Sequence, residues 1–385
     1  MFFEPALETP SRSRYTGGMI HIGIDTRITH YHTGGISIYA RHLINALESL
    51  DTNNHYTIFQ SRKAIRRLTS RFKESKLWTP PHHSLERLTL SVELVRHRLD
   101  ILHSTDFIPP LWGAKRHVIN VHDLTFLRYP QHKDSASQRY YNRQIEWAVK
   151  RADHVLTISK ASKRDIMDML NVPENKITVH PLGVADNFKP LSSDNLMYWR
   201  KKLNLSGNYV LFVSTLEPRK NIPALLTAYV ELPKELREQF PLLLVGRPGW
   251  LIDDTMKRIE QLQAQSHSIT VRSDINDEAL PAVYNMAQVL VMPSFYEGFG
   301  LTPLEAMACG IPTIVSDISS LPEVVGDVGL RIDPHDPSTL TSALEHALTD
   351  SGWRETTRKA GLERAKQFTW EQAARIILSV YRSVL

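Results

Sequence analysis

Residues 289–310 read VLVMPSFYEGFGLTPLEAMACG: an apolar strand pattern, a loop containing glycines and then a helix pattern. We predict that the strand ends at Ser294, that Thr302 is the N-cap and Pro303 the first residue of the helix, and that Gly310 ends it. A helix that starts just after a strand offers free backbone N–H groups and a partial positive charge. This turn can therefore hold a phosphate.

Two glutamates, Glu297 and Glu305, flank the start of this helix and are separated by seven residues. From spacing alone, Thr302-x-x-Glu305 favours a capping box over a ligand-binding role, because such boxes are common. Glu297 has no such local explanation, since it lies in the loop before Gly298.

On both sides of this segment, short apolar strands alternate with amphipathic helices, which is typical of parallel α/β sheets. Strands are expected at 19–27, 56–59, 101–104, 117–122 and 154–159, and again at 209–215, 241–246, 269–271, 289–294, 312–316 and 329–333. We predict two consecutive doubly wound units that bind ligands beyond the carboxyl ends of their strands.

Domain boundaries follow from breaks in this alternation. The N-terminus lacks a basic region followed by an apolar core, so it does not predict a secretory signal. NFKPLSSDN, with a proline and two serines, is typical of a linker. The expected parts are a disordered extension (1–18), an N-terminal domain (19–187), a linker (188–207), a C-terminal domain (208–367) and a last helix (368–385).

Composition excludes several classes of protein. Hydrophobic residues make up 42% and charged residues 23% of the 385 residues, which excludes a disordered or fibrous chain. A single cysteine, Cys309, allows no intramolecular disulfide and fits a reducing compartment. The sequence contains no run of 18 apolar residues, so it predicts no membrane-spanning helix.

The net charge of +5 conceals an asymmetry between the two halves of the chain. Residues 1–187 carry 26 Lys and Arg against 18 Asp and Glu, a net charge of +8. Residues 188–385 carry 20 against 23, a net charge of −3, and 14 of the 17 histidines lie in the first half. The asymmetry predicts two lobes with different partners.

Candidate ligand-binding residues follow strands in both halves. In YVLFVSTLEPRKNI, Arg219 and Lys220 lie between a strand and a helix capped by Asn221, where they either hold a diphosphate or are a solvated pair. In the first half, Gly34 and Gly35 open a helix, and they are either a close-approach site for a ligand or a simple loop.

His122, in NVHDL, ends another strand of the first half. It either hydrogen-bonds a sugar hydroxyl and acts as an acid or base, or it is a structural histidine.

Some motifs are absent from the sequence. It contains no Asp-x-Asp, no G-x-x-x-x-G-K-[ST] and no G-x-S-x-G. We therefore expect no metal pair bridging a diphosphate, no P-loop NTPase and no α/β-hydrolase.

Taken together, these motifs resemble the retaining nucleotide-sugar glycosyltransferases of GT-B fold. The likeness rests on EGFGLTPLEAMACG and TLEPRKN, and it covers roughly residues 19–385. Within that family, VHDLTFLRYP, ISKASKRDI, HPLGV, GRPGWL, SSLPEV and the tail FTWEQAAR are most similar to bacterial mannosyltransferases of O-antigen and exopolysaccharide assembly. The resemblance implies two Rossmann-like domains facing across a cleft, with the last helix crossing back to the first domain.

The resemblance also implies roles for individual residues. Arg219 and Lys220 would hold the donor diphosphate, Glu297 would lie beside the donor sugar, Glu305 would bind the ribose, and His122 would face the sugar. The remaining donor-binding positions that it implies are Gly34, Gly35, Phe299, Gly300 and Leu301, with Arg272 and Ser273 at the nucleobase. Ser273 is a departure, because family members often carry glycine there.

The resemblance favours same-face displacement with the leaving phosphate as base, without a metal or other cofactor. GDP-mannose is the expected donor, and a lipid-linked or polysaccharide glycan is the expected acceptor. The alternatives are a UDP- or ADP-sugar donor with glucosyl or rhamnosyl transfer, an epimerase or storage-polysaccharide synthase of the same fold, an inactive scaffold and a basic binding protein. We expect no nucleic-acid partner, because the basic half lacks interleaved aromatics and a known motif.

The segment SRKAIRRLTSRFKESKLW (61–78) has seven basic residues and one acidic residue. Its spacing predicts an amphipathic helix that either lies on an anionic membrane or packs on its own lobe. A cytoplasmic protein, peripheral on the inner face of the membrane, is the corresponding expectation. The candidate membrane contacts are Arg62, Lys63, Arg66, Arg67, Arg71, Lys73 and Lys76.

Overall fold

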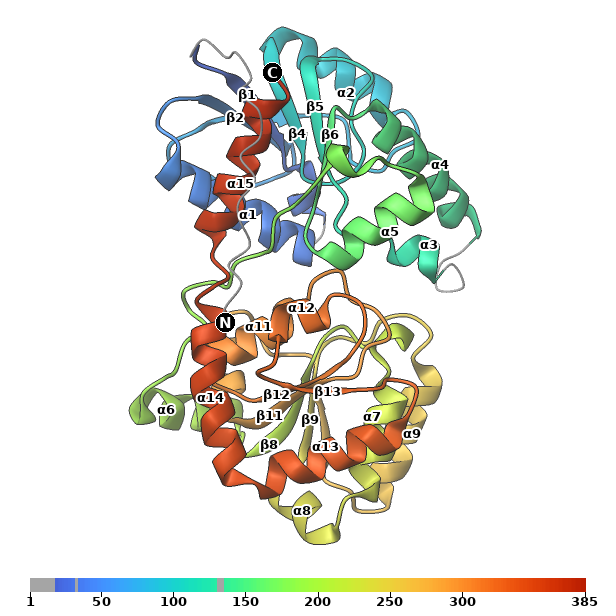
Figure 1. The fold of residues 1–385 in the computed structure, drawn as a ribbon, viewed down its shortest axis with the longest axis vertical. Coiled ribbons are helices and arrows are strands. Elements are labelled where there is room, and N and C mark those ends of the chain that lie inside the picture. Colours follow the sequence, from blue (N-terminus) through green and yellow to red (C-terminus); the bar gives the residue numbers. More distant parts are fainter. Residues whose placement is uncertain (1–17, 32–33, 130–134) are drawn as a thin grey trace, which may run out of the picture. The chain divides into compact units, whose positions relative to one another are not determined.

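The structure, a computed structural model, describes residues 18–31, 34–129 and 135–385 (Figure 1). The predicted extension at 1–18 lies, except for Gly18, outside the described residues. Two compact units are present. The first unit comprises the described residues up to Ile119 together with Arg151–His154 and Ala374–Leu385, and the second unit comprises Asn120–Lys150 and Val155–Ala373.

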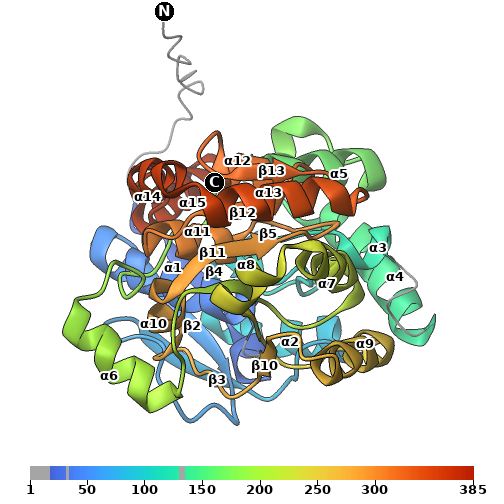
Figure 2. The same cartoon turned by 90° about the horizontal axis from the view of Figure 1, so that it is seen from below.

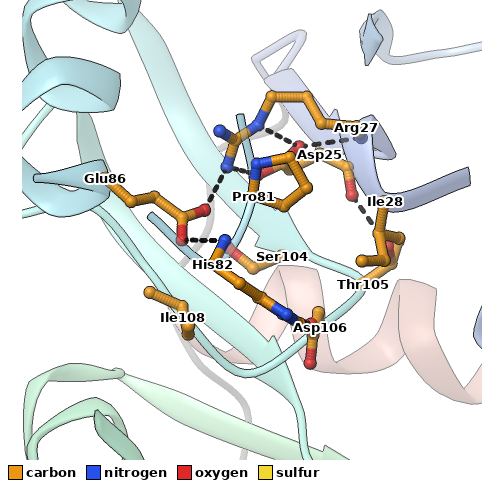
Figure 3. Close-up of a pocket in the computed structure, with 10 residues that line it drawn as sticks. All are labelled: Asp25, Arg27, Ile28, Pro81, His82, Glu86, Ser104, Thr105, Asp106 and Ile108. Atoms are coloured by element: carbon orange, nitrogen blue, oxygen red, sulfur yellow. Dashed lines mark hydrogen bonds and ion pairs between the residues drawn. The ribbon is translucent and has the colours of Figure 1, made fainter. Parts of the chain in front are cut away.

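The first sheet has seven strands in the order β3-β2-β1-β4-β5-β6-β7, and every strand pair of known register is parallel. After β1 the chain builds outward to β2 and β3, and it then returns to β4 on the other side of β1. The reversal between β1 and β4 brings Asp25 and Ser104, the last residues of these strands, to one edge (Figure 3). The strands are β1 (His21–Asp25), β2 (His55–Ser61), β3 (Lys73–Leu77), β4 (Leu99–Ser104), β5 (Ala114–Asn120), β6 (His154–Thr157) and β7 (Ile177–Val179).

The second sheet has six parallel strands in the order β10-β9-β8-β11-β12-β13, with the same kind of reversal between β8 and β11. Val210 of β8 lies opposite Leu242 of β9 and Val289 of β11. The strands are β8 (Tyr209–Val213), β9 (Leu242–Val245), β10 (Ile269–Arg272), β11 (Ala287–Met292), β12 (Thr313–Ser316) and β13 (Leu330–Ile332).

The helices occupy the connections between these strands. Short 3₁₀ turns occur at Arg27–His30, Val95–His97, Glu174–Lys176 and Pro218–Lys220. The α-helices are α1 (Gly35–Leu50), α2 (Glu86–Leu94), α3 (Thr125–Arg128), α4 (Ser135–Arg151), α5 (Lys160–Leu170), α6 (Ser193–Leu203), α7 (Ile222–Glu231), α8 (Lys234–Gln239), α9 (Asp253–Ala264), α10 (Leu280–Asn285), α11 (Leu301–Ala308), α12 (Leu321–Val325), α13 (Pro337–Thr349), α14 (Ser351–Ala365) and α15 (Trp370–Ser383).

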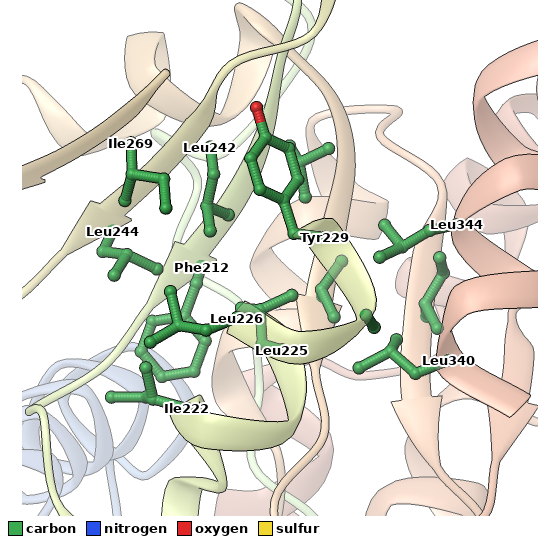
Figure 4. Close-up of a cluster of buried hydrophobic side chains, with 14 of the residues drawn as sticks. Phe212, Ile222, Leu225, Leu226, Tyr229, Leu242, Leu244, Ile269, Leu340 and Leu344 are labelled. Atoms are coloured by element: carbon green, nitrogen blue, oxygen red, sulfur yellow. The ribbon is translucent and has the colours of Figure 1, made fainter. Parts of the chain in front are cut away.

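Alternate residues of the second sheet enter two different hydrophobic cores. Phe212 of β8 packs with Leu225 of α7 and Leu340 of α13, whereas its neighbour Leu211 packs with Ala282 of α10. Figure 2 shows α7, α9 and α13 on one side of these strands and α6, α10 and α11 on the other, and Figure 4 shows the larger core. Burial on both faces explains why the strands read as continuous apolar runs.

The last helix, α15, joins the first unit through its C-terminal part. Ala374, Ile377 and Tyr381, spaced as one helix face, are buried there. The Tyr381 hydroxyl lies 2.6 Å from Nδ1 of His103 on β4. The predicted return of the last helix to the N-terminal part is therefore confirmed.

The helix predicted at 61–78 is wrong. The segment is a loop followed by the edge strand β3, which pairs with β2. Glu74 accepts a hydrogen bond from the Leu68 backbone N–H (2.9 Å), and Glu48 accepts from the backbone of Ser70 (2.8 Å). These tertiary contacts outweigh the helical spacing of the apolar residues.

The predicted linker, 188–207, contains helix α6. Leu196, Trp199 and Leu203 of this helix pack against one core of the second sheet. The described residues include no helix that is both long and apolar enough to cross a bilayer.

Candidate active site

The candidate site of the second unit lies where β8 and β11 end side by side. The chain leaves these two strands toward opposite edges of the sheet, and such a reversal opens a crevice beyond the carboxyl ends. The two loops are tied together, because the Phe295 backbone N–H donates to the Arg219 carbonyl over 2.8 Å. One loop brings Arg219 and Lys220, and the other brings Glu297.

Arg219, Lys220 and Glu297 form one buried ion cluster with Glu217. Lys220 Nζ lies 2.6 Å from Glu297 Oε1, and Arg219 Nη1 lies 3.0 Å from Glu297 Oε2. Arg219 Nε also contacts Glu217 Oε1 at 2.6 Å. The sequence alternative of a solvated Arg-Lys pair is wrong, because only 5% of Lys220 is exposed.

The electrostatics of the cluster keep Glu297 ionised. Burial raises the pKa of Glu297, but the charges of Lys220 and Arg219 outweigh that effect and lower it to about 2. Burial also lowers the pKa of the Lys220 ammonium, and the attraction of Glu297 offsets part of this. The two carboxylates of the cluster therefore balance its two cations. A bound diphosphate could take the place of the carboxylates as the partner of these cations.

The loop after β11 turns into α11 at a left-handed glycine. Gly300 is the N-cap with φ 106°, and a Cβ there would lie 2.9 Å from Leu321 Cδ2. The helix begins at Leu301, so the predicted N-cap at Thr302 and first position at Pro303 are each two residues too late. The backbone turns here because only glycine readily adopts this conformation, and no side chain caps the helix.

The predicted capping box is also wrong. The Glu305 carboxylate accepts a hydrogen bond from the Tyr284 hydroxyl over 2.8 Å instead of reaching back to the start of the helix. Burial raises the pKa of Glu305 to about 8, although the Tyr284 hydrogen bond lowers it. Gly310 follows the helix with φ 76°, as predicted for its end.

The loop before α11 is fixed by two serines. Ser320 Oγ lies 2.8 Å from the carbonyl oxygens of both Glu297 and Phe299, and the Glu297 N–H donates to Ser319 Oγ over 3.1 Å. Rigid loop geometry is what a preorganised anion site needs.

The helix start after Lys220 differs from the prediction in one detail. Helix α7 begins after Asn221, as expected, but the Asn221 side chain does not cap it. Instead, its amide donates to the Pro334 carbonyl over 2.7 Å.

Two motifs of the second unit meet next to the loop that carries Glu297, where the Ser162 hydroxyl donates to the Gly298 carbonyl over 3.3 Å. The carboxylate of Glu323, in SSLPEV, accepts from the backbone N–H groups of Lys160 (2.8 Å) and Ala161 (2.7 Å) at the start of α5, in ISKASKRDI. A carboxylate at a helix N-terminus is favourable, so this contact stabilises the start of α5.

The other predicted donor-binding residues are not brought into the cluster. Arg272 pairs with Asp274 (2.6 Å) and donates to the Leu203 carbonyl (2.9 Å), next to the exposed Ser273.

The predicted residues of the first half lie at the starts of helices and loops. Gly34 and Gly35, in the first unit, are exposed at the start of α1, with open space around each Cβ position. His122 is half-buried, two residues beyond β5. Their roles toward a donor stay predictions.

Sequence reasoning missed three residues that shape this site. Glu217 and Tyr284 are the partners of Arg219 and Glu305 described above. Asp123 raises the pKa of Arg219 through its charge, and its carboxylate oxygen Oδ2 would lie 2.8 Å from a Cβ at Gly298. Glu217 could have been found from its place two residues before Arg219, whereas Tyr284 is 21 residues from its partner.

Comparison with known proteins identifies the family. Residues 197–366 match the model described as glycosyl transferases group 1, and residues 33–188 match glycosyltransferase family 4. The chain is 36% identical, over 73% of its length and 74% of the relative's, to O-antigen chain mannosyltransferase B of Escherichia coli. The chain belongs to the GT-B glycosyltransferases and is a relative of the O-antigen mannosyltransferases.

Two further matches agree with this assignment. The glycosyltransferase is 31% identical to the serotype-specific mannosyltransferase WbdA of Escherichia coli over 64% of this chain, and it spans 30% of that relative's length. A solved structure of WaaG, a glycosyltransferase involved in lipopolysaccharide biosynthesis, superposes with a TM-score of 0.72 at 19% identity, over 93% of this chain and 99% of that one. The fold is therefore GT-B.

The group 1 match, residues 197–366, includes the ion cluster and the start of α11. Among the residues that the structure describes, no group of three or more His, Cys, Asp or Glu side chains is arranged to hold a metal ion.

Proposed function

We propose that this glycosyltransferase transfers mannose from GDP-mannose, with retention of configuration, to a lipid-linked or polysaccharide acceptor in lipopolysaccharide or exopolysaccharide assembly. The observation that carries the proposal is the buried Arg219–Lys220–Glu297 cluster at the strand reversal of the second sheet. The choice of mannose rests on the two related mannosyltransferases of Escherichia coli.

The cluster supports a reaction driven by stabilisation of the leaving group. When the anomeric C–O bond breaks, its electron pair goes to the diphosphate oxygen. Arg219, Lys220 and the backbone N–H groups at the start of α11 can stabilise that charge. The acceptor hydroxyl then bonds to the anomeric carbon from the same face, and its proton passes to the leaving phosphate oxygen. In this proposal no metal or other cofactor is needed.

In this reaction Glu297 positions the two cations. Its two carboxylate oxygens are each held by one cation, at 2.6 Å and 3.0 Å. A carboxylate so strongly paired, with a pKa of about 2, is a poor nucleophile and a poor base. These contacts support phosphate-assisted displacement over a covalent glycosyl-enzyme.

Glu305 fits the ribose of the nucleotide. Its buried carboxyl group accepts a hydrogen bond from Tyr284 and has acceptor sites for further donors. The two ribose hydroxyls are such donors.

The test is thermal unfolding with GDP, UDP, ADP and their mannose and glucose conjugates, because a ligand that binds the folded state raises the unfolding temperature. We expect GDP and GDP-mannose to give the largest increases. A larger increase in unfolding temperature with UDP or ADP would show that the donor is a UDP- or ADP-sugar, with the reaction class unchanged. No increase with any nucleotide would contradict the proposed donor site.

We also propose that the first unit docks on the anionic inner face of the cytoplasmic membrane. All seven basic residues predicted for membrane contact are exposed in the loop and in β3. Ile65 is 95% exposed among them, and Arg62 stacks on the exposed Trp78 at 4.1 Å. Cations next to an exposed aliphatic and an aromatic residue suit a headgroup region.

A further inference from the structure

The hydroxyl of Ser294, just beyond β11, is buried without a hydrogen-bond partner. The residue is 0% exposed, and among the residues that the structure describes no group forms a hydrogen bond with its Oγ. Most buried polar groups in proteins are hydrogen-bonded, because an unsatisfied group costs free energy. A hydroxyl left in this state next to an active site points to a partner that it gains during function.

Ser294 lies against the ion cluster. The next residue, Phe295, donates its backbone N–H to the Arg219 carbonyl over 2.8 Å, which fixes the end of β11 beside the loop that carries the two cations. Burial raises the pKa of Glu297, whereas the two cations and the Ser294 hydroxyl lower it. A hydroxyl has this effect only on a carboxylate close to it. The Ser294 hydroxyl therefore lies next to the Glu297 carboxylate without completing a hydrogen bond to it.

In the free enzyme the two cations already occupy the Glu297 carboxylate. Lys220 Nζ lies 2.6 Å from Oε1, and Arg219 Nη1 lies 3.0 Å from Oε2. While these ion pairs are intact, the carboxylate is stabilised without the Ser294 hydroxyl.

A bound donor changes this balance. In the proposed reaction the diphosphate attracts Arg219 and Lys220, so their contacts with Glu297 weaken. A buried carboxylate that loses its cations is costly unless hydrogen bonds replace them. The need for another hydrogen-bond donor at Glu297 therefore arises in the donor-bound state.

The backbone of Glu297 keeps this carboxylate inside the protein. Its N–H donates to Ser319 Oγ over 3.1 Å, and its carbonyl accepts from Ser320 Oγ over 2.8 Å. Since the backbone is fixed and the residue is only 8% exposed, water cannot take over from the cations. The Ser294 hydroxyl is a donor already in place for this role.

We propose that Ser294 is a positioning residue for the donor: when the diphosphate draws Arg219 and Lys220 toward itself, the Ser294 hydroxyl donates to Glu297 and holds its carboxylate. The inference rests on the proposed function, since the diphosphate of the nucleotide sugar creates the need. Ser294 acts through Glu297 and does not contact the donor.

The experiment uses the full-length enzyme and measures GDP affinity by calorimetry and the unfolding temperature without nucleotide. Ser294→Ala removes the hydroxyl, and a double-mutant cycle combines it with Glu297→Gln. Thr313→Val is the matched control. It removes another hydroxyl that is buried and has no partner among the described residues, but at the first residue of β12, on the opposite edge of the sheet from the cluster.

We expect Ser294→Ala to bind GDP about tenfold more weakly, because a hydrogen bond to a charged group is lost in the bound state. Its unfolding temperature without nucleotide should not fall, since the free protein leaves this hydroxyl unsatisfied. Thr313→Val should bind GDP as the wild type does. In the Glu297→Gln background, Ser294→Ala should change GDP affinity less than about twofold, because a neutral amide needs no such compensation.

Wild-type GDP affinity in Ser294→Ala would overturn the inference, and so would a lower unfolding temperature of this variant without nucleotide. A tenfold loss that persists with Glu297→Gln would show that Ser294 contacts the donor directly, which also overturns it. If the wild type binds UDP or ADP instead of GDP, the same variants are measured with that diphosphate. A wild type that binds no nucleoside diphosphate would instead count against the proposed function, so the two failures are distinguishable.

Discussion

Lys220 is a buried cation whose ammonium faces the carboxylate that also holds Arg219. We expect Lys220→Ala to reduce transfer at least about 100-fold, because a charge that stabilises the leaving diphosphate is lost. The free energy of unfolding should fall by about 3 kcal/mol, and the fold should persist because Glu297 keeps Arg219 as a partner.

Turnover measured with circular dichroism as the fold check tests this prediction. Lys202→Ala, on α6 with its ammonium 4.5 Å from the Trp199 ring, is the matched control and should keep normal turnover. Near-normal turnover in Lys220→Ala would refute the site assignment.

Glu305 gives a pH-dependent prediction. Burial raises its pKa to about 8 in the folded state from 4.5, so folding takes up a proton between these values. Stability from this group is full below pH 4.5 and is lost as the pH rises to about 8. The side chain of Glu305→Gln stays neutral at every pH. The free energy of unfolding of this variant should therefore rise relative to that of the wild type between pH 5 and pH 8, and the difference should stay constant above pH 8.

Urea unfolding of both proteins at pH 5, 7 and 9 measures this difference. The same variant should bind GDP about tenfold more weakly, since glutamine offers fewer acceptors to the ribose. A stability difference that does not vary with pH would show that Glu305 titrates normally.

At the scale of elements, the start of α11 depends on Gly300. An alanine there must adopt φ 106° and must displace Leu321, so we expect Gly300→Ala to destabilise the enzyme by about 1–3 kcal/mol. GDP affinity should fall as well, because the helix N-terminus moves. Gly352→Ala, in the first turn of α14 with only Asp350 near its Cβ position, is the control and should not destabilise.

The measurements are the unfolding temperature and GDP binding by calorimetry. If Gly300→Ala binds GDP as the wild type does, the backbone N–H groups of this turn do not contact the phosphates.

The order and type of most elements could be predicted from the sequence, because buried parallel strands form apolar runs between helices. β8 was expected at 209–215 and lies at Tyr209–Val213. The edge strand β3 was not predicted, since KESKL is polar and its strand conformation depends on pairing with β2. β7 was also missed, because a strand of three residues is too short to show a recognisable hydrophobic pattern.

The candidate site could be predicted only in part. Arg219, Lys220 and Glu297 were found because each lies just beyond a strand. Their pairing with one another was not found, since it joins residues 77 and 78 positions apart. The Arg27–Glu86 pair of the first unit spans 59 positions and has no local signal either.

At the scale of the whole molecule, the basic excess of the first half leads to a membrane prediction. Replacing Arg62, Lys63 and Arg66 by glutamine should weaken binding to anionic vesicles by about 3 kcal/mol, at about 1 kcal/mol for each cation. Binding by the wild type should also fall with salt. Sedimentation with phosphatidylglycerol and phosphatidylcholine vesicles measures both effects.

The control replaces three exposed lysines of the second unit, Lys234, Lys257 and Lys359. This variant should bind vesicles as the wild type does. Equal binding of the wild type to anionic and neutral vesicles at low salt would contradict membrane docking by charge.

The edge strand β3 has a consequence for solubility. As the outer strand of its sheet it has unpaired backbone groups on one side, and such an edge can pair with a second copy and start aggregation. Lys73 and Lys76 are exposed on this strand and make edge-to-edge pairing costly, since like charges would meet. Replacing both by valine should lower the concentration at which light scattering begins, and an unchanged onset would remove this protective role.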